Sequence, residues 1–140
     1  MFAEPEAAFV RSQRLLRLAT VAADGQPDAD VVAFAWDGRR FVIGGHQLER
    51  SRKFKNVAGG HRNVSLILDN LPSVQPWRPR GIKIHGIATP VEQAGRFRLG
   101  HHLTVEPLVS WSWGINGESF QNGRFRPQKR VWPASGGTSE

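Results

Sequence analysis

Glycines and basic side chains that follow residue 43 have the chemistry to bind an anionic ligand. Gly44 and Gly45 carry no side chain, so a ligand could approach the backbone closely there. Residues 51–56 (SRKFKN) follow, and guanidinium and ammonium groups are suited to phosphate. We expect Arg52 and Lys53 to bind it. On pattern alone, a solvated helix face is the commoner explanation of such a charge run.

A second cationic group lies in residues 76–81 (PWRPRG). Arg78 and Arg80 stand beside the indole of Trp77 on a segment stiffened by two prolines, which limits the entropy lost on binding. Such a segment could hold an anionic or planar ligand. It could equally be a structural cap over the mouth of a barrel.

Two tryptophans form the third group, in residues 109–114 (VSWSWG). Trp111 and Trp113 share one face at strand spacing. Their rings could stack on a flavin-like ring, or pack in the core or in a dimer interface. The pattern alone favours packing.

Other chemistry has no support in the sequence. No cysteine is present, which excludes a disulfide framework, a thiolate nucleophile and an iron–sulfur centre. The five histidines lack the spacing of a metal site, and no nucleophile elbow, Walker loop or Rossmann fingerprint occurs. The 19 Lys and Arg against 12 Asp and Glu give a net charge of +7, which predicts an anionic partner: nucleic acid, a phosphorylated cofactor or an acidic metabolite.

The length of 140 residues predicts one domain, over residues 1–125, with a flexible tail over residues 126–140. A site must therefore be built on one core or shared with a second copy. No stretch approaches the roughly 20 apolar residues of a membrane span, and the acidic N-terminus is unlike a signal peptide. We therefore expect a soluble, cytoplasmic protein without a membrane partner.

Short strands dominate the pattern along the chain. A helix is expected over residues 4–13 and another over residues 46–58, which Gly59 and Gly60 end. Turn signals at 24–25 and 37–38 join the first strands as hairpins. The three prolines in residues 71–80 predict an extended loop, and Pro107 predicts a bend. The expected strands are residues 15–22, 28–36, 40–44, 63–69, 81–91 and 103–113.

These elements predict a mainly β fold with short helices, closed or partly closed as a barrel. A doubly wound parallel sheet is not expected, because hairpin turns join the strands.

The order of the segments resembles the pyridoxamine 5′-phosphate oxidase-like split-barrel flavoproteins, in the class that uses the deazaflavin coenzyme F420. The resemblance spans residues 15–114 and rests on LATVAADGQPDADVVAFAWDG, FVIGG, SRKFKN, NVSLILD, PWRPRGIKIHG and VSWSWG. It implies a six-stranded antiparallel, Greek-key-like split barrel and a homodimer with the cofactor between the subunits. It also implies hydride transfer between coenzyme F420 and an unidentified small organic substrate, with FMN as the alternative cofactor.

The resemblance also assigns cofactor-binding residues. Arg52 and Lys53 match the phosphate-binding residues, and the late aromatic residue near the ring, contributed by the partner subunit, matches either tryptophan of the third group. No residue is assigned as catalytic, and His46 and His85 are acid–base candidates by type and position only. The expected cofactor-binding residues are Val32, Ala33, Phe34, Gly44, Gly45, Arg52, Lys53, Asn56, Arg78, Arg80, Trp111 and Trp113.

Two other functions stay open at this point. Five tryptophans, a pI near 11.2 and the RFRPQKR segment would suit a module that stacks on single-stranded nucleic acid, although the cations cluster on a helix and a loop rather than along a strand face. The second open function is that of a non-catalytic cofactor carrier. F420 has a longer anionic tail than FMN and therefore suits the basic residues of the first two groups better. These residues are Arg52, Lys53, Lys55, Arg78 and Arg80.

Overall fold

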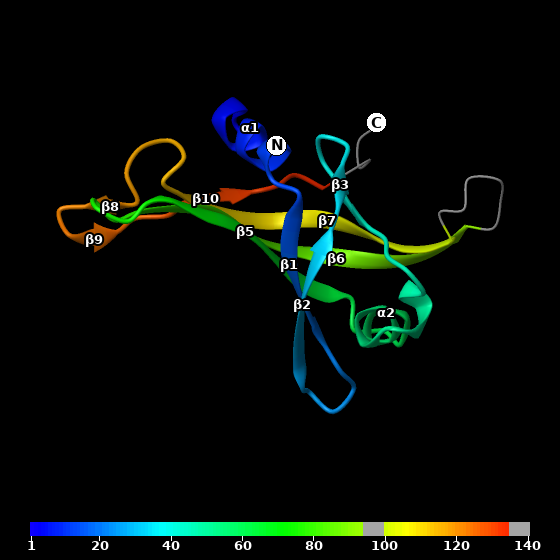
Figure 1. Cartoon of the computed structure of the whole chain (residues 1–140). Helices are drawn as coiled ribbons and strands as arrows, with labels where there is room; N and C mark the ends of the chain where they lie inside the picture. Colours follow the sequence, from blue (N-terminus) through cyan, green and yellow to red (C-terminus); the bar gives the residue numbers. More distant parts are fainter. Residues whose placement is uncertain (94–99, 135–140) are drawn as a thin grey trace.

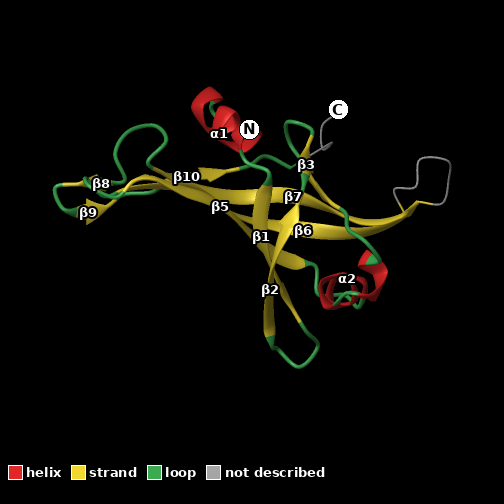
Figure 2. Cartoon of the chain, in the orientation of Figure 1, coloured by secondary structure: helices red, strands yellow, loops and turns green. Residues whose placement is uncertain are grey.

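The computed structural model describes residues 1–93 and 100–134 as a curled antiparallel sheet with two short α-helices (Figures 1 and 2). The mainly β, split-barrel fold class is thereby confirmed. The helices are α1 Glu4–Ser12 and α2 Arg52–Ala58, with a 3₁₀ turn η1 Leu48–Arg50 before α2. The strands are β1 Leu15–Val21, β2 Pro27–Ala33, β3 Ala35–Trp36, β4 Phe41–Ile43, β5 Asn63–Ser73, β6 Arg78–Gln93, β7 Gly100–Trp113, β8 Phe120–Gln121, β9 Arg124–Phe125 and β10 Gln128–Val131.

The main sheet has eight strands rather than the six expected. Its order is β2-β1-β5-β6-β7-β4-β3, and β10 pairs with β7 beside that path. One extra strand arises because the expected strand over 28–36 bends at Phe34 and divides into β2 and β3. These two strands lie at opposite ends of the sheet order although a single residue separates them, so the sheet has to curl.

One edge of β7 is shared by two short strands. β4 pairs with residues 103–105, and β10 pairs with residues 109–112. Between them the register against β6 shifts at His85 and Gly86, opposite the stretch that contains Pro107. Proline has no N–H for the ladder, and a bulge accommodates it. The bend predicted at Pro107 is therefore confirmed.

The expected flexible tail over 126–140 is wrong for its first part. Residues 128–131 form β10, and Trp132 is 4% exposed with its Nε1 donating to Ser110 Oγ at 3.0 Å. The polar sequence of β10 concealed the strand, because three of its four side chains are exposed. Residues 135–140, also in that prediction, lie outside the described residues.

The expected extended loop over 71–80 is also wrong. β5 continues to Ser73 and β6 begins at Arg78, so only residues 74–77 form the turn of a long hairpin. The prolines are tolerated because the register is irregular between Asn70 and Ser73, where Pro72 stands.

The predicted core residues of both helices are buried, but the second α-helix begins at Arg52 rather than at residue 46, after the separate 3₁₀ turn η1. In α1, Phe9 and Val10 are buried in the core, as predicted, and in the second helical segment Leu48, Phe54 and Val57 are buried. The β3–β4 turn is stabilised by Asp37, which accepts hydrogen bonds from the backbone N–H groups of Arg40 and Arg39 at 2.6 and 2.8 Å. Those bonds lower the pKa of the Asp37 carboxyl. No helix within residues 1–93 and 100–134 is long and apolar enough to cross a membrane.

A buried carboxylate attaches α1 to the sheet. Glu6 is 1% exposed, and its Oε2 accepts a hydrogen bond from Ser112 Oγ at 2.6 Å. Its Oε1 accepts from Arg130 Nη2 at 3.0 Å and from the Ala3 backbone N–H at 2.9 Å. A buried charge is costly without partners, and these bonds supply them. Since Ser112 lies on β7 and Arg130 on β10, the bonds also connect α1 with both strands.

We expect Glu6→Gln to lower the free energy of unfolding by about 1–3 kcal/mol, since Arg130 loses its buried counter-charge. Urea denaturation would measure the loss. Glu4→Gln is the matched control, because Glu4 is exposed and its pair with Arg11 lies at the surface, where pairs contribute about 1 kcal/mol or less. Equal effects in the two variants would contradict the role assigned to Glu6.

Candidate functional site

The start of α2 presents a guanidinium group at an open hollow. Ser51 caps the helix: its Oγ accepts from the Phe54 N–H at 3.3 Å and donates to the Leu48 carbonyl at 2.6 Å. The next residue, Arg52, is exposed and lines a hollow of about 480 Å³ beside the β1–β2 hairpin. Asp24 and Asp28 line the same hollow. Arg52 can therefore donate to an anion there, in competition with two carboxylates.

Lys53 is held by an acidic residue of the same chain. Its side chain is 17% exposed, and its Nζ lies 3.6 Å from Asp30 Oδ2 on β2. This pair was not predicted, although Asp28 and Asp30 are two residues apart on the expected strand and so share one face. Lys53 consequently offers fewer donors to a ligand than Arg52 does.

Asn56 points into the protein. Its side chain is buried, and its Nδ2 donates to Thr20 Oγ1 on β1 at 3.0 Å. This bond satisfies two buried polar groups and connects α2 with β1. The geometry therefore assigns Asn56 a structural role in the packing of α2.

The strand residues predicted along the cofactor ring face different ways. Val32 is in the core, Ala33 is exposed on the outer side of β2, and Phe34 packs against the core beside Phe41, with 5.7 Å between ring centroids. At Gly44, which follows β4, a Cβ atom would meet nothing within 4 Å. The backbone at residues 44–45 is thus open to an approaching group.

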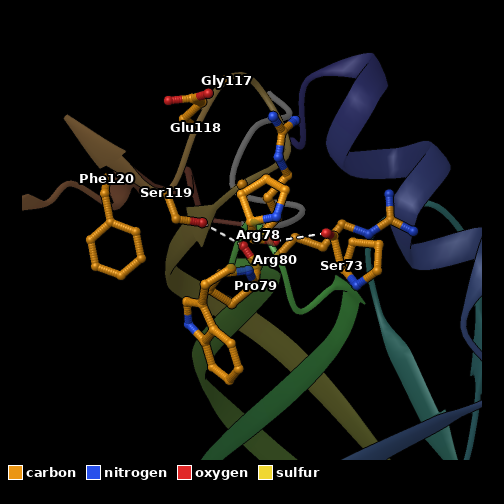
Figure 3. Close-up of a pocket in the computed structure, with 12 residues that line it drawn as sticks. Ser73, Arg78, Pro79, Arg80, Gly117, Glu118, Ser119 and Phe120 are labelled. Atoms are coloured by element: carbon orange, nitrogen blue, oxygen red, sulfur yellow. Dashed lines mark hydrogen bonds between the residues drawn. The ribbon is translucent and has the colours of Figure 1, made fainter. Parts of the chain in front are cut away.

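A larger hollow lies at the far end of the long hairpins (Figure 3). Its volume is about 620 Å³, and Arg78 and Arg80 are among the residues that line it. The Arg80 Nε donates to Asn70 Oδ1 at 2.7 Å, and its guanidinium lies 5.1 Å above the Phe9 ring of α1. The other lining residues are Pro72, Ser73, Pro76, Trp77, Pro79, Gly114, Gly117, Glu118, Ser119 and Phe120.

Glycine at the end of β7 allows this hollow to form. Gly114 has a φ of +70°, and a Cβ there would lie 2.3 Å from the Pro79 carbonyl oxygen. Ser119 Oγ donates to that same carbonyl. The close approach connects the segment after β7 with the start of β6 and forms one wall of the hollow.

Trp111 and Trp113 lie on the outer face of the sheet, so the prediction that they share a face is confirmed. Trp111 opposes Lys83 on β6, whose Nζ is 4.6 Å from the indole centroid. Trp113 lies over Gly81, where a Cβ would come within 2.7 Å of the indole. Both rings are half-buried and contact their own sheet.

The chain does not bring all predicted residues together. Figure 1 places α2 and the turn between β5 and β6 at different ends of the sheet. Arg52 and Lys53 therefore lie far from the hairpin-tip hollow with Arg78 and Arg80. No three His, Asp or Glu side chains gather as a metal site in the part of the chain that the structure describes.

We expect Asn56→Ala to lower the free energy of unfolding by about 1–3 kcal/mol, because it leaves the Thr20 hydroxyl buried without its partner. Thermal unfolding would measure this effect. Lys55→Ala, one residue earlier and exposed, is the control and should change stability little. An Asn56→Ala protein as stable as the control would refute the structural role.

Comparison with known proteins identifies one family model and a related reductase. The family model described as pyridoxamine 5′-phosphate oxidase matches residues 2–130. The chain is similar to a 5a,11a-dehydrotetracycline/5a,11a-dehydrooxytetracycline reductase from Streptomyces rimosus, at 37% identity over 123 residues, which cover 84% of this chain and 86% of that protein.

Solved structures agree in fold. A conserved hypothetical protein from Mycobacterium tuberculosis superposes with a TM-score of 0.66 at 22% identity, over 82% of this chain and 86% of that one. An F420 reductase superposes with a TM-score of 0.59 at 16% identity, over 78% of this chain and 98% of that one. At these identities, the structural matches establish the fold.

Proposed function

The chain is an oxidoreductase of the pyridoxamine 5′-phosphate oxidase family, and on that premise we propose that it is a reductase that transfers a hydride between coenzyme F420 and a small organic substrate. The observation that carries the proposal is the 37% identity to a reductase over most of both chains. FMN is the alternative cofactor. The net charge of +7 supports the more anionic of the two.

The cofactor site is proposed at the start of α2. The exposed Arg52 supplies a forked donor at an open hollow, which suits a phosphate oxygen pair. Gly44 and Gly45 leave the neighbouring backbone accessible, and in this proposal the backbone of Val32, Ala33 and Phe34 completes the cleft. Lys53 adds a second cation, shared with Asp30.

The cofactor when bound would supply the hydride chemistry, so the protein needs no nucleophile of its own. The chain's part is to bind the anionic group with Arg52 and to hold the ring against backbone at residues 32–34 and 44–45. A rigid sheet is suited to this task, because it fixes the distance between two reactants.

A second copy of the chain is proposed to complete the site. The α2 region and the hairpin tip lie at different ends of one chain (Figure 1), so no single copy can bring both to one reaction. The outer sheet face offers a mixed surface for the contact: Val31, Ile67 and Trp111 lie in one row of its register, with Arg17 and Lys83 between them. Val31 is 59% exposed. A homodimer would bury this row.

Arg52→Ala is expected to weaken F420 binding by tenfold or more, about 1.5–3 kcal/mol for a charge-assisted contact. Lys53→Ala should weaken it less, because its ammonium group is already directed at Asp30. Fluorescence titration with F420, and separately with FMN, would measure both affinities and decide between the cofactors.

Two further variants sharpen this test. Asp30→Asn removes the carboxylate that competes for Lys53 and should tighten binding, while Arg14→Ala removes an exposed cation elsewhere and should leave it unchanged. Wild-type protein that binds neither cofactor would refute the proposed function. Unchanged affinity in the Arg52→Ala/Lys53→Ala double variant would refute the location of the site.

Val31→Glu should convert the protein from dimer to monomer, because it places a charge in the proposed interface. Light scattering after gel filtration would measure the mass of each species. Val131→Glu is the control, since Val131 is similarly exposed, at 70%, but lies on β10, outside that row. A wild-type protein that is monomeric at micromolar concentration would contradict the shared site.

A further inference from the structure

We propose that the hollow at the β5–β6 hairpin tip binds a planar, acidic ring system, which is the substrate class of the reductase; this inference rests on the proposed function above. Arg78, Arg80 and the aromatic residues Trp77 and Phe120 line the hollow (Figure 3). These residues then form a site apart from the cofactor site at α2, to which the resemblance assigned the two arginines.

The hollow has the size of a small-molecule site. Its volume of about 620 Å³ lies inside the range of roughly 300–1,000 Å³ that is typical of ligand pockets. It exceeds the hollow beside Arg52, which measures about 480 Å³. A fused-ring molecule would fit within it.

Its aromatic residues are exposed without a ligand. Trp77 is 58% exposed and Phe120 is 40% exposed. Among the described residues, no other aromatic ring packs on Trp77, whereas Phe120 contacts Phe125 with 5.8 Å between centroids. A planar ligand over the Trp77 indole would remove apolar surface from water and gain a stacking contact.

The charge of the hollow favours a ligand with few negative charges. Arg78 and Arg80 face one acidic lining residue, Glu118, and no ion pair holds either arginine within residues 1–93 and 100–134. The two arginines and Glu118 together give the lining a net charge of +1. An ionised enol or phenol on a ring system matches it better than the carboxylate-rich tail of F420 does, and the walls of Pro72, Pro76 and Pro79 offer that tail no donors.

The walls of the hollow are preformed. Ser73 Oγ donates to the Pro76 carbonyl at 2.7 Å, and Ser119 Oγ donates to the Pro79 carbonyl. Asn70 fixes the Nε of Arg80, with 2.7 Å between the two atoms. Proline and these bonds restrict the hairpin before a ligand arrives, so little conformational entropy is lost on binding.

Tetracycline, a fused four-ring compound with an acidic enol system, is the probe that tests the inference, titrated by its fluorescence in EDTA so that no metal ion mediates binding. Trp77→Ala and Arg78→Ala should each weaken tetracycline binding by about tenfold. Trp77→Phe should retain most of the affinity, because it keeps an aromatic face. Leu71→Ala and Arg124→Ala are the controls: both residues are exposed and outside the lining, Leu71 on β5 of the same hairpin and Arg124 on β9.

The same variants are titrated with F420 and FMN. Unchanged cofactor affinity in Trp77→Ala and Arg78→Ala, together with lost tetracycline binding, supports the inference. Tetracycline affinity that is absent in wild-type protein, or equal in all variants, overturns it. Loss of cofactor affinity in the same two variants also overturns it, because the hollow then belongs to the cofactor. If the protein binds tetracycline in a way that depends on Trp77 but has no affinity for F420 or FMN, the ligand site is supported and only the proposed function is refuted.

Discussion

A single residue, Phe34, imposes the curl on which the rest of the structure depends. β2 and β3 stand at the two ends of the sheet order, and the chain has only Phe34 with which to pass from one to the other. A flat sheet would hold its end strands far apart, so this connection requires the sheet to bend around a core. The inward side chains of β1, β5 and β6 then meet; Leu16, Leu66 and Ile84 are all fully buried.

The curl also determines what must cover the sheet. A half-closed barrel leaves apolar side chains at its openings, and α1 and α2 lie over different parts of it (Figure 2). Buried polar side chains under these helices bond across to the sheet: Glu6 accepts from Arg130 and Ser112 under α1, and Asn56 donates to Thr20 under α2. Such groups stabilise helix docking because leaving any of them unpaired would cost more than the bond contributes.

The central strands are longer than the barrel requires, and this extra length separates the functional residues. β5, β6 and β7 extend past the core to the hairpin tip, where Gly81 and Gly114 permit close contact with Trp113 and Pro79. Arg78 and Trp77 are thereby placed far from Arg52. The hollow beside Arg52 and the hollow beside Arg78 therefore lie apart, each incomplete as a redox site, which is why a second copy enters the proposed function.

Local chemistry made much of the fold predictable. α1, the turns at Gly25 and Gly38 and the bend at Pro107 depend on neighbours within a few residues, and alternation placed Trp111 and Trp113 on one face. Predictions failed where a segment far away in the sequence determines the local structure. β10 is a strand because β7 offers it an edge for pairing, and the prolines near residue 72 are accommodated by a register irregularity against β6.

Residue types and their spacing were enough to predict the antiparallel β class, the two helices, the absence of cysteine chemistry and the basic residues able to bind an anion. Contacts between distant segments determine which of those residues are committed elsewhere. Lys53 is paired with Asp30, Asn56 bonds to Thr20, and Arg52 and Arg78 lie at different ends of the sheet. The reason is physical: a residue's type fixes what it can bind, whereas contacts between segments far apart in the chain fix what it can reach.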